Sequence, residues 1–479
     1  EFLYFAMGDH LDLLRMQFPP LIAVAARLLD ALTGTTVLAT RLAASLAGAA
    51  YLLVTVLIAR DMGGARRAQL LAGVGVLVSP VFLRAGTLFQ PVVFEQVWWL
   101  VACWALVRLL REDGPGWWIV LGVALGLAAL TKFSAAFLAA GVLAAVLLSP
   151  RRADLREPWP WYALGIAVLI GLPSLTGQMT WDWPFLAQAR ELRASQLARV
   201  SALDFVGGQF MLLAGAAPLA LLGLMGLLLG RALQGWRALE PWRPLGALVV
   251  VAAALFLALG GKAYYLAPVH GLLIGAGAVQ VERWLGRGPS TAPPVLAGAM
   301  CALGVLVLPI AVPVLAPDGI ASYAARLGMT KVTETNTGTQ LELPQDFADM
   351  LGWEEQVAAV AEVYGGLTPE ERARVTVLGT NYGRAGALQH YGPRHGLPRP
   401  VSLAGDFYHW GPGDRPGDLL IVVGGDPATL SQLFRSVTLV RTVRNPRGVE
   451  EEREVPIFVV RDPVQDFRET WRRMGPQWG

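Results

Sequence analysis

Two apolar runs, WWIVLGVALGLAALT (117–131) and FSAAFLAAGVLAAVLLS (133–149), are separated by a single residue, Lys132. A helix needs roughly 17 to 25 apolar residues to cross the hydrocarbon core of a bilayer. The two runs lie at or just below that length, so two crossing helices or one tight re-entrant pair would fit them. Both arrangements require a membrane.

Eight further apolar runs raise the expected number of membrane-spanning segments to about ten. The chain is 54% hydrophobic and only 16% charged, with a mean hydropathy of +0.48. Soluble globular chains do not have this composition. Cys103 and Cys301 both lie inside apolar runs, so no disulfide framework or cysteine metal site is expected. The further runs are 35–59, 68–83, 92–111, 159–176, 204–230, 244–260, 263–282 and 292–314.

The loops between the runs form two alternating sets that differ in positive charge. One set holds 13 Lys and Arg residues, and the other holds 7 although it is longer in total. Cytoplasmic loops carry the excess of positive charge, so the richer set is expected inside and everything after residue 315 outside. The basic residues do not form one patch, and no nucleic-acid partner is expected. The richer loops are 60–67, 108–116, 149–158, 231–244 and 282–290; the others are 1–20, 82–92, 131–133, 177–203 and 260–264.

Three regions follow from these patterns. Residues 1–34 alternate apolar and polar side chains at helical spacing, which is typical of helices that lie in the membrane interface. Residues 35–315 form the transmembrane domain, and residues 316–479 read as a small outer α/β domain. The chain opens on Glu1 with no signal peptide in front, so we expect that a spanning helix before Glu1 is missing.

The tail after residue 316 has the pattern of a soluble α/β domain. Short buried strands are expected at 375–379, 418–425, 437–443 and 456–460, and an amphipathic helix at 353–367. The sequence GGD (424–426) is interpreted as a turn after a strand, because no nucleotide-binding glycine pattern accompanies it.

Several motifs in chain order resemble the bacterial membrane glycosyltransferases of the C-type fold, which include the protein O-mannosyltransferases (family 39) and the lipid A aminoarabinose transferase. The motifs are PPLIAVAARLLDALTG followed by RLAASLAGA near the N-terminus, GTLFQPVVFEQVWWL (86–100), GLAALTKFSAAF (126–137), GKAYYLAPVHGLL (261–273), FADMLGWEEQVAAVAEVYGGLTPEERA (347–373) and NYGRAGALQHYGPRHGLP (381–398). The resemblance implies a polytopic α-helical membrane protein of the C-type glycosyltransferase fold with a small C-terminal α/β domain.

The activity that the resemblance implies is transfer of a sugar from a polyprenyl-phosphate donor to a hydroxyl of a lipid, glycan or protein. The expected place is the outer face of the bacterial inner membrane, among membrane lipids. A multi-pass transporter or flippase is the alternative, since many spans and intramembrane charges would also serve it. No cofactor is expected to be required, and participation of a divalent metal stays open because lysines can also neutralise a phosphate.

Displacing a phosphate from a sugar carbon requires a base near the attacking hydroxyl and positive charge near the departing oxygens. Glu1 and Glu95 are the expected catalytic carboxylates. Glu1 has this role only through the resemblance, because the family opens its first outer loop with an acidic pair. Glu95 lies inside the start of a span, where a carboxylate is costly unless it has a function. The structural alternative is an interfacial carboxylate paired with a neighbour such as Arg84.

Lys132, Lys262 and Tyr265 are expected to bind the donor phosphate. The role of Lys132 follows from the resemblance, and the alternative is a lysine that reaches the headgroups from a helix end. Lys262 arrives with two tyrosines in GKAYYLAP, and a cation plus a phenol at a helix start suits a phosphate. An aromatic belt with an interfacial lysine would give the same pattern.

Tyr264, Asp182 and His10 are the candidate contacts to the sugar or the acceptor. Asp182 lies between Trp181 and Trp183, so stacking and hydrogen bonding to a sugar are possible, although tryptophans are also common at membrane interfaces. His10 beside Asp9 equally fits a solvated interfacial pair. The histidines at 390, 395 and 409 lack metal-ligand spacing, and no metal site is expected.

Overall fold

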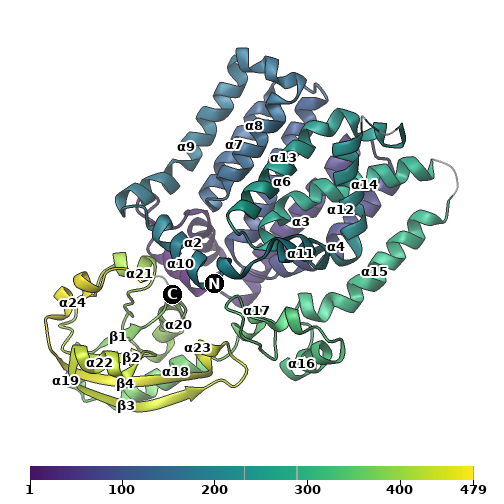
Figure 1. The fold of residues 1–479 in the computed structure, drawn as a ribbon. Coiled ribbons are helices and arrows are strands. Elements are labelled where there is room, and N and C mark those ends of the chain that lie inside the picture. The colour runs from purple at the N-terminus through teal and green to yellow at the C-terminus, as the bar shows by residue number, and fades with distance from the viewer. Residues whose placement is uncertain (231, 233, 287–289, 478–479) are drawn as a thin grey trace. The chain divides into compact units, whose positions relative to one another are not determined.

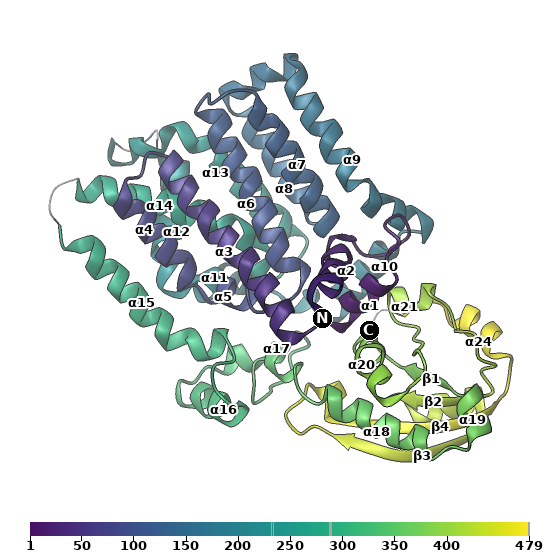
Figure 2. The same cartoon turned by 180° about the vertical axis from the view of Figure 1, so that it is seen from behind.

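The computed structural model describes residues 1–230, 232, 234–286 and 290–477, and these form two compact units (Figures 1 and 2). The membrane unit comprises Leu13–Ile22 and Leu29–Val314. The α/β unit comprises Glu1–Asp12, Ala23–Leu28 and Leu315–Gly479. The helix α2 (Leu21–Thr33) therefore contributes residues to both units.

Helices make up the membrane unit. Sequence signals set several of their starts, including a Thr36 cap on α3 and prolines in the first turns of α6 and α9. The elements are α3 (Val37–Asp61), α4 (Arg66–Leu77), α5 (Pro80–Ala85), α6 (Pro91–Leu110), α7 (Gly116–Thr131), α8 (Ala135–Leu147), η1 (Pro150–Arg156), α9 (Pro158–Thr180), α10 (Pro184–Ser195), η2 (Leu197–Arg199), α11 (Ala202–Leu213), η3 (Ala214–Ala216), α12 (Ala217–Leu229), η4 (Gln234–Trp242), α13 (Arg243–Ala258), η5 (Ala263–Val269), α14 (His270–Leu285) and α15 (Ala292–Ala311).

Fewer helices than the expected ten or so meet the length and composition of a membrane span. Among the described residues seven helices are long and apolar enough to cross a membrane, or eight if α8 and η1, bent by 101° at their junction, count as one span. The segments expected at 68–83 and 117–131 form α4 and α7, but these have only 12 and 16 residues. Hydropathy alone does not separate these cases, because a short helix buried among other helices is as apolar as a helix that faces lipid.

Close packing of small residues holds the membrane unit together. Helix α7 packs between α6 and α9, and α8 packs on α13 (Figure 1). Helices α12 and α14 approach so closely that a methyl group on Gly223 would lie 1.9 Å from the Leu273 carbonyl oxygen, and one on Gly277 would lie 1.8 Å from that of Leu219. Small residues at such crossings let helix backbones touch where lipid supplies no hydrophobic driving force.

The α/β unit is built on a four-stranded sheet of order β1-β2-β4-β3, in which β1 and β2 run parallel and the other pairs antiparallel. All four expected strands and the expected helix α18 are present, but the strand expected to be buried at 437–443 is mostly exposed. The elements are α1 (Phe2–Asp9), α16 (Pro317–Arg326), η6 (Thr330–Thr333), α17 (Gln345–Ala348), α18 (Trp353–Gly365), α19 (Pro369–Arg374), β1 (Thr376–Gly379), α20 (Tyr382–Tyr391), η7 (Gly392–His395), α21 (Asp406–His409), β2 (Leu419–Val423), α22 (Pro427–Leu433), β3 (Phe434–Arg444), α23 (Glu450–Arg453), β4 (Glu454–Pro463) and α24 (Phe467–Met474).

Each face of this sheet has its own core. Side chains alternate along β2, so that Leu419 and Ile421 pack with α18 and α20, whereas Leu420 and Val422 pack with α22 and α24. The N-terminal helix α1 also joins this unit. The Phe2 ring lies 5.8 Å from the Trp353 ring and 5.5 Å from the Tyr391 ring, measured between centroids.

Asp349 makes the stability of the α/β unit depend on pH. Burial, reinforced by the nearby carboxylates of Asp346 and Glu452, raises the pKa of Asp349 from 3.8 to about 7. The unfolded chain loses this proton near pH 4, so the folded state holds more protons between pH 4 and 7. We therefore expect the free energy of unfolding to fall as the pH rises through that window, by on the order of 1 to 4 kcal/mol.

The variant Asp349→Asn should remove this part of the pH dependence. Thermal unfolding at pH 5.5 and 8.5 measures it, with the exposed Asp318→Asn as the matched control. The wild type and the control should lose stability at the higher pH by the same amount, and Asp349→Asn by less. An equal loss in all three proteins would contradict this assignment.

Candidate active site

Glu95 and Lys132 form a buried ion pair in the membrane unit. Pro91 starts α6, which places Glu95 within its first two turns, and only 2% of the Glu95 side chain is exposed. Lys132 follows the last residue of α7 in an extended conformation, in the link to α8. The Lys132 Nζ lies 3.0 Å from Glu95 Oε2, and the Ser134 hydroxyl donates a hydrogen bond to Glu95 Oε1. Both carboxylate oxygens thus have a donor.

Two tyrosine rings complete the surroundings of Lys132. Its Nζ lies 4.7 Å from the ring centroid of Tyr265 and 5.8 Å from that of Tyr264, which are cation–π distances. Tyr265 in turn contacts Phe256 of α13, with ring centroids 5.7 Å apart. Three segments far apart in sequence, the start of α6, the α7–α8 link and η5, therefore meet at one charged centre.

Lys262 lies at the start of η5, two residues before Tyr264. Its Nζ donates a hydrogen bond of 2.6 Å to Gln196 Oε1, and Gln196 lies directly before η2. Lys262 is half-buried. Lys262 is thus close in sequence to the tyrosines that face Lys132. Its hydrogen bond, however, is to Gln196 in the α10–η2 segment.

The structural alternative for Glu95, an ion pair with Arg84, is wrong. Arg84 lies in α5 and its Nη2 donates to the carbonyl oxygen of Ile310 at the end of α15. Glu95 instead finds its cation on the α7–α8 link, which sequence spacing could not show. A buried pair of this kind is costly to break, because the remaining charge stays desolvated.

The other expected site residues are Asp182, Glu1 and His10. Asp182 is exposed in the turn between α9 and α10, with a positive φ of 56°. Glu1 and His10 belong to the α/β unit. The His10 ring stacks on Trp410 with centroids 3.9 Å apart, and burial lowers its pKa. The structure brings Glu95, Lys132, Tyr264 and Tyr265 together, with Lys262 on the same segment as the tyrosines.

Sequence reasoning missed Ser134 and Gln196. Ser134 had a signal, since Thr131, Lys132 and Ser134 interrupt an otherwise apolar stretch within four residues. Polar side chains grouped in the middle of such a stretch predict a shared hydrogen-bonded site. Gln196 had no comparable signal, because it lies in a polar segment and does not stand out from its neighbours.

Tyr51 fixes the segment that carries the tyrosines. Its buried hydroxyl lies 3.1 Å from the carbonyl oxygen of Ala267, as a donor, and accepts a 2.7 Å hydrogen bond from the Gly271 N–H. These bonds tie α3 to the junction between η5 and α14. The side chain thereby holds the backbone just after Tyr265 in place.

The variant Tyr51→Phe should destabilise the membrane unit by roughly 1 to 3 kcal/mol, because it leaves a buried donor and acceptor unpaired. Unfolding of the purified chain in detergent measures the change. Tyr162→Phe, which removes an exposed hydroxyl on α9, is the matched control and should leave the unfolding midpoint unchanged. Equal midpoints for the two variants would remove this role from Tyr51.

A metal site has no support in the described residues, since no group of three or more His, Cys, Asp or Glu side chains there could hold an ion. Lys132 and the Ser134 hydroxyl are the hydrogen-bond donors to Glu95, and two tyrosine rings lie beside the lysine. Lysine carries no lone pair when charged, so the pair around Lys132 suits an anion rather than a cation.

A multi-pass helical unit joined in one chain to a small α/β unit is the architecture of the C-type membrane glycosyltransferases, and this chain has that fold. Residues 17–176 match the family model described as dolichyl-phosphate-mannose-protein mannosyltransferase. No curated protein matches the sequence.

One solved structure supports the fold over nearly the whole chain. The crystal structure of ArnT from Cupriavidus metallidurans in the apo state is similar with a TM-score of 0.57 at 15% identity, covering 95% of this chain and 91% of that one. The archaeal oligosaccharyltransferase AglB from Archaeoglobus fulgidus, in complex with an inhibitory peptide and a dolichol-phosphate, gives a TM-score of 0.42 at 12% identity, covering 80% of this chain and 56% of that one.

Proposed function

We propose that this protein is an integral-membrane glycosyltransferase that moves a sugar from a polyprenyl-phosphate donor to a hydroxyl of a lipid, glycan or protein. The observation that carries the proposal is the buried Glu95–Lys132 pair with Tyr264 and Tyr265 beside it. The fold and the family-model match over residues 17–176 support the class of reaction.

The reaction is a single displacement with inversion at the sugar carbon. The acceptor oxygen forms a bond to that carbon as the bond to the phosphate oxygen breaks, and the acceptor proton passes to a carboxylate. Glu95 is the proposed base, with Glu1 the second candidate. The departing polyprenyl phosphate carries the negative charge, which Lys132 and Lys262 neutralise, and the Tyr265 hydroxyl donates a hydrogen bond to it.

The ion pair accounts for how Glu95 and Lys132 would be positioned before the donor binds. Lys132 orients one oxygen of Glu95 and Ser134 orients the other. An incoming phosphate competes with Glu95 for the lysine, so donor binding frees the base at the moment when an acceptor hydroxyl can use it.

The remaining expectations complete the proposal. Tyr264, Asp182 and His10 are proposed contacts to the sugar or the acceptor. The distribution of Lys and Arg supports a bacterial inner-membrane location with the α/β unit outside. Residues 1–34 are proposed to lie in the interface, residues 35–315 to form the transmembrane domain and residues 316–479 the extracytoplasmic domain.

Donor turnover in nanodiscs tests the proposal. The purified chain is supplied with polyprenyl-phosphate sugars and a hydroxyl-bearing lipid acceptor, and release of free polyprenyl phosphate is followed. We expect cleavage coupled to product formation. Movement of intact donor across liposome bilayers without cleavage would instead favour a flippase.

A further inference from the structure

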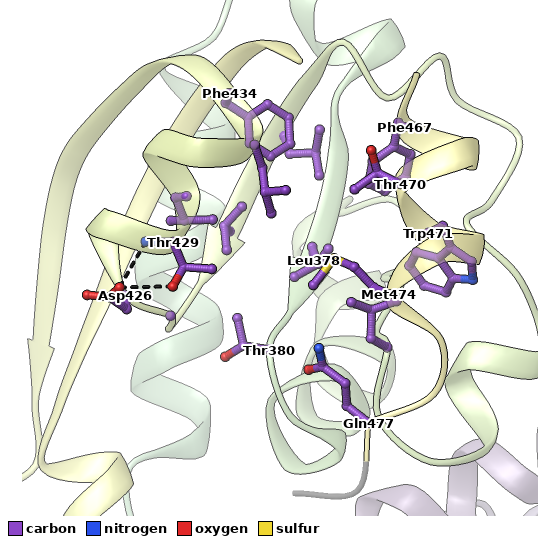
Figure 3. Close-up of a pocket in the computed structure, with 16 residues that line it drawn as sticks. Leu378, Thr380, Asp426, Thr429, Phe434, Phe467, Thr470, Trp471, Met474 and Gln477 are labelled. Atoms are coloured by element: carbon purple, nitrogen blue, oxygen red, sulfur yellow. Dashed lines mark hydrogen bonds between the residues drawn. The ribbon is translucent and has the colours of Figure 1, made fainter. Parts of the chain in front are cut away.

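A hollow of about 230 Å³ opens in the α/β unit, on the sheet face covered by α22 and α24 (Figure 3). Figure 3 shows Phe434 and Thr429 on one side, with Phe467, Thr470, Trp471 and Met474 facing them from the other. Strands β1 and β2 supply the floor. The apolar lining residues are Leu378, Leu403, Leu420, Val422, Leu430, Leu433, Phe434, Phe467, Trp471 and Met474.

The hollow is partly open to solvent, and it has room for a small aromatic body, since a cavity of about 150 Å³ is enough to hold benzene. On one wall, Trp471 stacks in parallel on Tyr408 with ring centroids 5.7 Å apart and is only 4% exposed. A preformed, mostly apolar pocket with a few polar groups is the usual form of a small-molecule site.

The polar side chains of the lining come from Thr380, Asp426, Thr429, Thr470 and Gln477. Thr470 lies beside Phe467, on the side opposite Asp426 and Thr429 (Figure 3). Asp426 is the one charged residue among the described residues of the lining. The Asp426 Oδ2 accepts hydrogen bonds from the Thr429 N–H at 2.9 Å and from its hydroxyl at 3.0 Å. These bonds lower the pKa of Asp426, so the group is a carboxylate at neutral pH.

The charge of the lining selects the ligand. A carboxylate accepts up to about four hydrogen bonds, and the two from Thr429 leave acceptor capacity for a ligand. No lysine, arginine or histidine is among the lining residues that the structure describes, so an anionic head would be repelled without compensation. An amine head is attracted, and a hydroxyl head is tolerated.

We infer that this hollow is a binding site for a small hydrophobic amine, with the apolar body between α22 and α24 and the ammonium group beside Asp426. This site is independent of the proposed sugar transfer, since it lies wholly within the α/β unit and shares no residue with the Glu95–Lys132 pair. Its occupancy would give the α/β unit a ligand-sensing role of its own.

Three probes with one apolar body and different heads test the inference: phenylbutylamine, phenylbutanol and phenylbutanoate. Their affinities for the full-length chain in nanodiscs are measured by saturation-transfer NMR, and empty nanodiscs give the contribution of partitioning. The amine should bind about two- to fivefold more tightly than the alcohol, as expected for an exposed ion pair, and the acid more weakly than both.

Variants locate the binding. Asp426→Asn keeps the helix cap and should abolish the preference for the amine over the alcohol. Leu433→Trp fills the hollow from α22 and should weaken all three probes at least tenfold. Met474→Trp fills it from α24 and serves the same purpose if Leu433→Trp does not fold.

Three outcomes would overturn the inference. One is binding no stronger than to empty nanodiscs. Another is wild-type affinity in the folded cavity-filling variants, which would place the ligand elsewhere. The last is an acid that binds as tightly as the amine.

Discussion

Replacing Glu95 by glutamine is expected to lower donor turnover roughly 100- to 10,000-fold, the range seen when a general base is lost. Glutamine has nearly the same shape, can accept from Ser134 and does not leave a buried charge. Lys132 is 29% exposed and can reach water without its partner. The loss should therefore appear in kcat while the chain remains folded.

Glu112→Gln is the matched control for this experiment. Glu112 lies just past the end of the same helix, its carboxylate is 74% exposed, and it pairs with Arg151. Its variant should keep wild-type turnover. If Glu95→Gln also kept it, Glu95 would be a structural carboxylate, and Glu1 would become the leading candidate for the base.

Replacing Lys132 by methionine is expected to destabilise the membrane unit by about 3 to 5 kcal/mol, because Glu95 would stay buried without its cation. Unfolding in mixed micelles measures this loss. The matched control is Arg151→Met, which removes a cation from the exposed pair with Glu112. That control should cost about 1 kcal/mol or less.

The double variant Glu95→Gln/Lys132→Met separates stability from activity. Removing both members of a buried pair leaves no desolvated charge, so its stability should return close to that of the wild type. A double variant as unstable as Lys132→Met would show that lost packing of the lysine, and not the unpaired carboxylate, causes the effect.

The sequence predicts the class of fold well because the relevant physics is local. A mostly apolar run of 20 residues such as 91–110 has few options other than a buried or spanning helix, and the short continuous apolar run at 419–423 is typical of a strand buried on both faces. The number of spans is harder to predict, because helix length, unlike hydropathy, depends on where packing ends the helix. The 16-residue α7 ends at Thr131 so that the chain can turn towards α8.

The site was only partly predictable. Intramembrane charge identified Glu95 and Lys132 as notable, but their 3.0 Å contact depends on how α6 lies against the α7–α8 link. The approach of Tyr265 to Lys132 depends on η5, which lies more than one hundred residues further along the chain. Such tertiary contacts leave no spacing signal in one sequence, which is why Lys132 could not be recognised as the partner of Glu95.

Single-turnover transfer by the Glu95→Gln/Lys132→Met double variant is the most direct test. The double variant should fold with wild-type stability and insert into nanodiscs. It should release polyprenyl phosphate at least about 100-fold more slowly than the wild type, because the base and the phosphate-binding cation are both gone. A stable double variant that transfers sugar at the wild-type rate would show that sugar transfer takes place without this pair.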